Sequence, residues 1–128
     1  MVKRPLVSVV DDDESVRESL PDLIREFGFA VQAFSSAEEF LASDYVGLTD
    51  CLILDVAMPG MQGLELQQVL ERERRSVPIV FITAHGNAAS RTRAMSQGAA
   101  GYLLKPFSAA GLLDALNNAL KPKRGAGR

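Results

Sequence analysis

Hydrophobic residues in this chain form two kinds of segment that alternate along its length. Three segments are short and almost continuously apolar, as is typical of strands covered by helices on both faces. They are Leu6–Val10, Cys51–Leu54 and Ile79–Ile82. Weaker runs at Ala30–Phe34 and Gly101–Leu104 fall where a regular alternation of strands and helices requires two more. The pattern therefore predicts five strands.

The segments between these strands carry apolar residues at helical spacing. One face of the first expected helix, which Gly28 ends, is formed by Val16, Leu20, Leu23, Ile24 and Phe27. Pro21 lies inside it and removes a backbone hydrogen bond, so we expect a kink or a restart of the helix there.

Four further helices follow. Ser35 and Ser36 precede Glu38 and Glu39 by three residues each, which is a capping-box start for the second helix. We expect a third helix after Gly63, with an apolar face that includes Leu66, Val69 and Leu70, a fourth over residues 87–97 with Gly98 as its cap, and a fifth that begins at Ser108 and buries Leu113, Leu116 and Leu120.

Strict alternation without repeats predicts one doubly wound α/β domain with a five-stranded parallel sheet and five helices. The 128 residues are 47% hydrophobic, which is enough for one full core. After Leu120 the sequence becomes KPKRGAGR and loses apolar periodicity. We therefore expect a domain over residues 1–120 and a flexible basic tail or linker over 121–128.

Composition narrows the possible functions. No apolar tract is long enough to cross a bilayer, and the amino-terminal residues lack the apolar stretch and cleavage site of a signal peptide, so we expect a cytoplasmic protein without membrane contact. The net charge of −2 argues against direct nucleic-acid binding by this domain. The single cysteine, Cys51, lies inside an apolar strand and is expected to be inert.

Five residues with useful chemistry follow the predicted strands: Asp11, Asp12, Asp55, Thr83 and Lys105. The carboxyl ends of parallel strands gather at one edge of a sheet, so these side chains are expected to meet in one pocket. Carboxylate oxygens suit Mg²⁺, which would also relieve their mutual repulsion. One carboxylate could then attack a phosphorus atom, while Lys105 and Thr83 stabilise the transferred group.

Four motifs in this order resemble the receiver domain of two-component response regulators, and the resemblance covers residues 6–120. They are Val10–Glu14, Leu54–Gly60, Ile82–Gly86 and Gly101–Phe107. The resemblance implies a flavodoxin-like strand order 2-1-3-4-5. Further details of the sequence, such as Ser35–Leu41, look most like the subgroup whose members commonly carry a helix-turn-helix output domain.

The resemblance also implies roles for particular residues. Asp55 would accept a phosphoryl group from a sensor histidine kinase. Asp11, Asp12, Asp55 and the backbone carbonyl of Ala57 would hold Mg²⁺, with Mn²⁺ as an alternative. Asp13 could be a third acid near the metal, but its spacing from Val10 favours a solvated residue before the first helix.

Other implied roles concern the phosphoryl group and the switch. Thr83 and Lys105 would contact the phosphoryl group, and the Lys105-Pro106 peptide bond would be cis. Tyr102 would turn between exposed and buried positions as Thr83 moves. Ala57 and His85 are candidates for tuning the phosphoryl lifetime, although His85 could equally be a loop residue without a function.

The implied output is a change in the surface of the fourth helix, fifth strand and fifth helix. This surface would control an output domain or partner, with transcription as the expected process, and phosphorylation could promote a homodimer. The domain would be a phosphoacceptor rather than an enzyme, since it catalyses only its own phosphorylation and dephosphorylation.

Two alternatives remain at this point. The chain could be a receiver-like interaction module that is never phosphorylated. It could also be a haloacid-dehalogenase-type phosphatase with Asp11 as nucleophile and Asp13 as acid/base. That reading needs a late acidic motif for which only Asp114 is present, and it leaves Asp55–Gly60 without a purpose.

Overall fold

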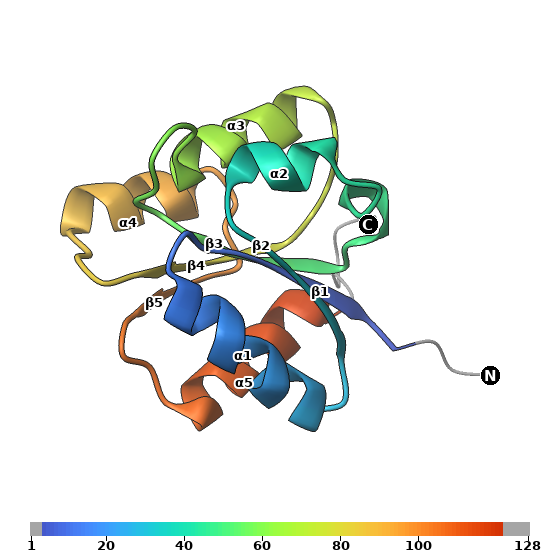
Figure 1. Ribbon diagram of the computed structural model, residues 1–128. Helices are drawn as coiled ribbons and strands as arrows, with labels where there is room; N and C mark the ends of the chain where they lie inside the picture. The colour runs from blue at the N-terminus through green and yellow to red at the C-terminus, as the bar shows by residue number, and fades with distance from the viewer. Residues whose placement is uncertain (1–3, 122–128) are drawn as a thin grey trace.

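A five-stranded parallel sheet forms the centre of the protein (Figure 1). The computed structural model describes residues 4–121. The strand order is β2-β1-β3-β4-β5, which confirms the expected 2-1-3-4-5 arrangement. The strands are β1 (Leu6–Val10), β2 (Ala30–Phe34), β3 (Cys51–Asp55), β4 (Ile79–Thr83) and β5 (Gly101–Leu104). All five predicted strands are present, with β3 and β4 each one residue longer than expected.

Five α-helices cover the two faces of this sheet. Helices α1 and α5 lie on one face, and α2, α3 and α4 lie on the other (Figure 1). Their bounds are α1 (Glu14–Glu26), α2 (Ala37–Ala42), α3 (Gly63–Arg72), α4 (Ala88–Ser96) and α5 (Ala109–Leu120), and a short 3₁₀ helix, η1 (Val46–Leu48), precedes β3. Among residues 4–121, no helix combines the length and apolar character needed to cross a membrane.

Polar side chains begin most of these helices by accepting a free backbone N–H of the first turn. Ser36 accepts from the Glu39 amide, which confirms the predicted start of α2, and Ser108 accepts from the Gly111 amide at α5. Asp13 and Asn87 play the same role at α1 and α4. The starts of these helices are therefore encoded locally.

Two local details differ from the sequence prediction. Of the two outcomes expected at Pro21, a kink or a restart, the restart is wrong, because helix α1 continues through Pro21 to Glu26. Pro21 lies on the buried face with Leu20 and Ile24, and this packing offsets the loss of one helical hydrogen bond. Gly63 does not precede α3 but is its first residue. A Cβ atom at Gly63 would lie 2.4 Å from the Asp55 carbonyl oxygen, so the helix can approach β3 only without a side chain there.

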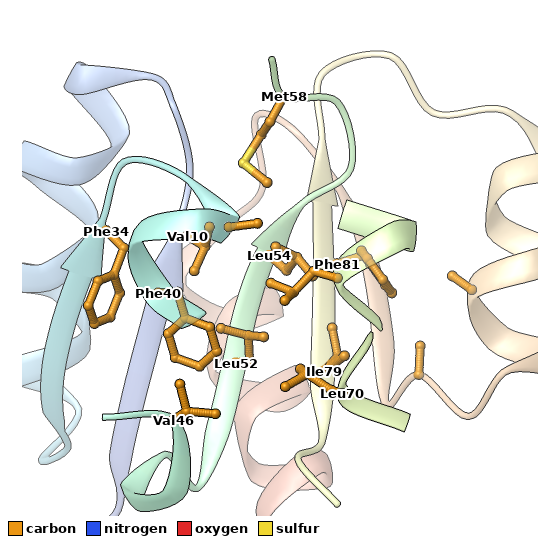
Figure 2. Packing of buried hydrophobic residues seen from close by; sticks show 14 residues of the cluster. Val10, Phe34, Phe40, Val46, Leu52, Leu54, Met58, Leu70, Ile79 and Phe81 are labelled. Carbon is orange, nitrogen blue, oxygen red and sulfur yellow. The ribbon is translucent and has the colours of Figure 1, made fainter. Parts of the chain in front are cut away.

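The hydrophobic core has two parts, one on each side of the sheet. Figure 2 shows the part between the sheet and helices α2, α3 and α4, where Phe40, Leu54 and Phe81 are fully buried. The second part lies under α1 and α5. Helix α5 buries Leu112, Leu116 and Ala119, while Leu113 and Leu120 are only half-buried.

The expected inward residues of α5 therefore all contact this core. The sequence pattern missed Leu112 and Ala119, which are buried more deeply than Leu113 and Leu120. The basic tail expected over residues 121–128 stays a prediction, because all of it except Lys121 lies outside the described residues.

Candidate metal site

Three carboxylates meet at the carboxyl edge of the central strands. Asp11 directly follows β1, Asp12 is the next residue, and Asp55 ends β3. The two strands are neighbours, with Val10 paired to Leu54, so the residues after this pair lie side by side. Carboxylate oxygens of Asp11, Asp12 and Asp55 all lie within 4.8 Å of one another. The predicted acidic cluster is therefore present.

Lys105, the residue after β5, brings a positive charge into the same cluster. Its Nζ atom donates to Asp11 Oδ2 at 2.8 Å and lies 3.8 Å from Asp55 Oδ2. The Lys105 amide donates to the Thr83 carbonyl at 2.8 Å, and the Lys105-Pro106 peptide bond is cis, the isomer expected from the sequence. The lysine thus partly compensates the charge of two buried carboxylates.

Asp11 is held from several directions. It is fully buried, its Oδ1 atom accepts the Asp13 amide at 2.9 Å, and its backbone carbonyl accepts a hydrogen bond from the Arg17 guanidinium. Asp13 itself is exposed and points away to cap α1, where Ser15 donates to it and lowers the pKa of its carboxyl. Asp13 is therefore a helix cap rather than a member of the cluster.

Asp55 has the most strongly shifted pKa of the cluster, and it is only 5% exposed. Burial, followed by repulsion from Asp11, raises the pKa of the Asp55 carboxyl to about 7, although Lys105 acts in the opposite direction. Burial alone would lower the pKa of Lys105, but its hydrogen bond to Asp11 and the nearby negative charges outweigh this and raise it. Lys105 is therefore a cation at neutral pH, and the carboxylates still carry excess negative charge.

This donor set fits a small, hard divalent cation. Mg²⁺ prefers oxygen ligands and keeps several waters, so two or three clustered carboxylates with one exposed member are sufficient. Asp12 is exposed, which leaves one side of the cluster open to solvent. Ala57 is also exposed and lies in the loop after β3. A bound cation would relieve the repulsion that raises the pKa of Asp55.

Thr83 ends β4 at the same edge of the sheet. Its side chain is almost fully buried, and its Oγ1 atom accepts the His85 amide at 3.2 Å. His85 is exposed in the loop after β4. The register pairs Thr83 with Leu104, directly before Lys105, so the hydroxyl and the ammonium come from adjacent strand ends.

Tyr102 on β5 connects this edge to helix α4. Its ring is half-buried against Phe81, with ring centroids 6.5 Å apart, and its hydroxyl shares a 2.5 Å hydrogen bond with Ser90 Oγ. Ser90 could not be predicted as a partner of Tyr102, because nothing in the local sequence distinguishes it from other helical serines. Helix α4 and the tyrosine are thus coupled in this structure.

A cavity of about 740 Å³ lies elsewhere, among residues that include Gln67, Arg75, Ile79 and Asn118. Ile79 begins β4, so this cavity is at the opposite edge of the sheet from the carboxylates. None of the acidic cluster residues lines it. The candidate site is therefore the cluster of charged groups and not this cavity.

Comparison with known proteins agrees with this geometry. The family model of the response regulator receiver domain matches residues 7–117. Nodulation protein W of Bradyrhizobium diazoefficiens is 47% identical over 113 residues, which cover 88% of this chain and 50% of that protein. The response regulator protein TodT of Pseudomonas putida is 40% identical over 116 residues, which cover 91% and 51%.

Solved structures give the same result. The response regulator StyR superimposes with a TM-score of 0.85 at 48% identity, over 92% of this chain and 60% of that one. The structure named FixJ-N has a TM-score of 0.83 at 35% identity, over 93% and 95%. The chain thus spans about half the length of the curated relatives it matches.

Proposed function

Because this chain belongs to the response regulator receiver domain family, we propose that Asp55 accepts a phosphoryl group from a sensor histidine kinase in a Mg²⁺-dependent reaction. The observation that carries the proposal is the cluster of Asp11, Asp12 and Asp55 around the Lys105 ammonium. This combination supplies a nucleophile, oxygen ligands and a fixed cation within a few ångströms. Binding of a divalent metal alone would not require the lysine.

The proposed transfer is a displacement at phosphorus. An Asp55 carboxylate oxygen forms a bond to phosphorus while the bond from phosphorus to the kinase histidine nitrogen breaks, and the electron pair of that bond stays on the imidazole. Mg²⁺, when bound, supplies positive charge against the phosphoryl oxygens. The Lys105 ammonium and the Thr83 hydroxyl each donate to a different phosphoryl oxygen, which stabilises the transferred charge.

The proposed output is a change at the surface of α4, β5 and α5. Movement of Thr83 towards the phosphoryl group would free space for Tyr102 and release its hydrogen bond to Ser90. The partner is proposed to act in transcription, since similar proteins are named transcriptional regulatory proteins, TdiR and FixJ among them. A Tyr102→Ala variant should be phosphorylated normally but lose the change in partner binding, and full switching would contradict this route.

The direct test is intact-mass analysis after incubation with Mg²⁺ and acetyl phosphate. The wild type should gain one hydroxylamine-labile phosphoryl adduct, and Asp55→Asn should gain none. Asp11→Asn should react more slowly, because it loses a metal ligand but keeps the nucleophile. Absence of an adduct in the wild type would instead favour a receiver-like module that acts without phosphorylation.

The phosphatase alternative has no support in this structure. Both Asp11 carboxylate oxygens are engaged, one by the Asp13 amide and one by Lys105, so Asp11 is poorly placed as a nucleophile. Asp114, the acid required late in the chain, is exposed on α5 and lies outside the carboxylate cluster. An adduct that survives in Asp55→Asn but is lost in Asp11→Asn would restore this alternative.

A further inference from the structure

Glu38, in the first turn of α2, contacts a loop that lies 23 residues later in the sequence. Its Oε2 atom accepts the Met61 amide at 2.9 Å. A Cβ atom placed on Gly60 would lie 2.7 Å from the same Oε2, so the carboxylate rests directly against the loop backbone. Gly60 also has a φ of +73°, a conformation that favours glycine. Together these contacts form a close-fitting tether between helix and loop.

The tethered loop is the segment that follows Asp55 and includes Ala57. At its start the Val56 amide donates to the Ile82 carbonyl at 3.0 Å, and at its end the Gly63 amide donates to the Val56 carbonyl at 3.0 Å. In its middle, the side chain of Met58 is buried and points towards the core beside α2 (Figure 2). Between Met58 and Gly63, the Met61 amide is bonded to Glu38, so this bond fixes the exposed part of the loop.

We propose that Glu38 is a positioning residue that holds the loop after β3 in the conformation required for metal binding and phosphoryl transfer at Asp55. This inference rests on the proposed function and adds a residue that lies outside the carboxylate cluster. Loss of the tether lets the loop sample other conformations. Binding of the metal and the phosphoryl donor must then also order the loop, and this entropic cost weakens binding.

Glu38 is free for this role because its neighbour performs the helix cap. The Glu39 carboxylate accepts the Ser35 amide, and the Ser36 hydroxyl accepts the Glu39 amide, so the start of α2 does not depend on the Glu38 side chain. The Met61 hydrogen bond lowers the pKa of Glu38, so its carboxylate is ionised at neutral pH. A hydrogen bond to an ionised acceptor is stronger than one between neutral groups.

The experiment compares Glu38→Ala, Glu38→Gln and the matched control Glu39→Ala by amide-resolved NMR. Exchange of the Met61 amide with solvent should be about fivefold faster in Glu38→Ala, which is the effect of one typical net hydrogen bond. A Mg²⁺ titration followed through the amides near Asp55 should give several-fold weaker binding in Glu38→Ala. Glu38→Gln keeps an acceptor oxygen, so its Met61 exchange rate and its Mg²⁺ affinity should both lie close to those of the wild type.

Glu39→Ala should destabilise α2 yet leave Mg²⁺ affinity and Met61 exchange close to those of the wild type. Equal losses of Mg²⁺ affinity in Glu38→Ala and Glu39→Ala would overturn the proposal, because the effect would then come from helix stability. Faster Met61 exchange with unchanged Mg²⁺ affinity would also overturn it. Failure of the wild type to bind Mg²⁺ would be a distinct result that removes the proposed function itself.

Discussion

Replacement of Asp55 by asparagine should stabilise the metal-free protein at pH 8. Folding buries the Asp55 carboxyl beside Asp11 and raises its pKa from 3.8 to about 7. Each pKa unit corresponds to about 1.36 kcal/mol, so ionisation of this group costs the folded state up to about 4 kcal/mol above pH 7. The pKa of about 7 already includes the favourable contact with Lys105, so we expect a net gain of up to about 4 kcal/mol in the free energy of unfolding.

The direction of the pH dependence follows from proton binding in the two states. Between about pH 4 and pH 7 the folded protein keeps a proton on Asp55 that the unfolded chain has released. Stability of the wild type therefore falls as the pH rises through this range, relative to Asp55→Asn. The two proteins should be close in stability near pH 4, and the difference should reach its full size near pH 8.

Urea unfolding in the presence of EDTA measures this difference directly. Wild type and Asp55→Asn are compared at several pH values between 4 and 8, so that the titration of all other groups cancels. Added Mg²⁺ at pH 8 should then stabilise the wild type more than the variant, because it relieves the repulsion between Asp11 and Asp55. The control is Asp44→Asn, which changes an exposed acid outside the cluster and should have little effect.

A lower or equal stability of Asp55→Asn at pH 8 would refute the reasoning. So would a difference between the two proteins that does not change with pH. Either result would mean that Lys105 and bound water compensate the charge of Asp55 fully in the folded protein, so that its ionisation carries no cost.

Three further outcomes are expected. Cys51 is buried with a pKa raised to about 12, so it should react with a thiol reagent at pH 8 only on unfolding, and rapid labelling of the native protein would contradict this. Phe81→Ala should lower the free energy of unfolding in urea by about 3–5 kcal/mol, whereas Leu104→Ala, at an exposed site, should change it by about 0.5 kcal/mol or less. Ala57→Arg places a large cation beside the proposed phosphoryl site and should change the half-life of the adduct in a mass-spectrometric time course; an unchanged decay rate would exclude this tuning role.

The strands, the helix starts and the position of the acidic edge could be predicted from local sequence, whereas the strand order came from the resemblance to receiver domains. Strand period, helix caps and the residues after each strand depend on neighbours within a few positions, and these neighbours are visible in the sequence. Ser36 and Ser108 cap the helices that they were expected to begin, and Asp11 and Asp55 lie at the expected strand ends. The resemblance to receiver domains then supplied roles that local patterns cannot.

Tertiary structure decided the features that join distant parts of the chain. Lys105 and Asp11 are 94 residues apart in the sequence. Only the assembly of the strands into one sheet sets the 2.8 Å distance between Lys105 Nζ and Asp11 Oδ2, and hence the electrostatics of Asp55. How deeply each residue of α5 is buried depended on its packing against the sheet, which buries Leu112 fully and Leu113 only in part. The Glu38 tether required a loop conformation that no local pattern encodes. Local sequence thus determined the elements and their ends, whereas packing over long separations determined the distances that control the chemistry.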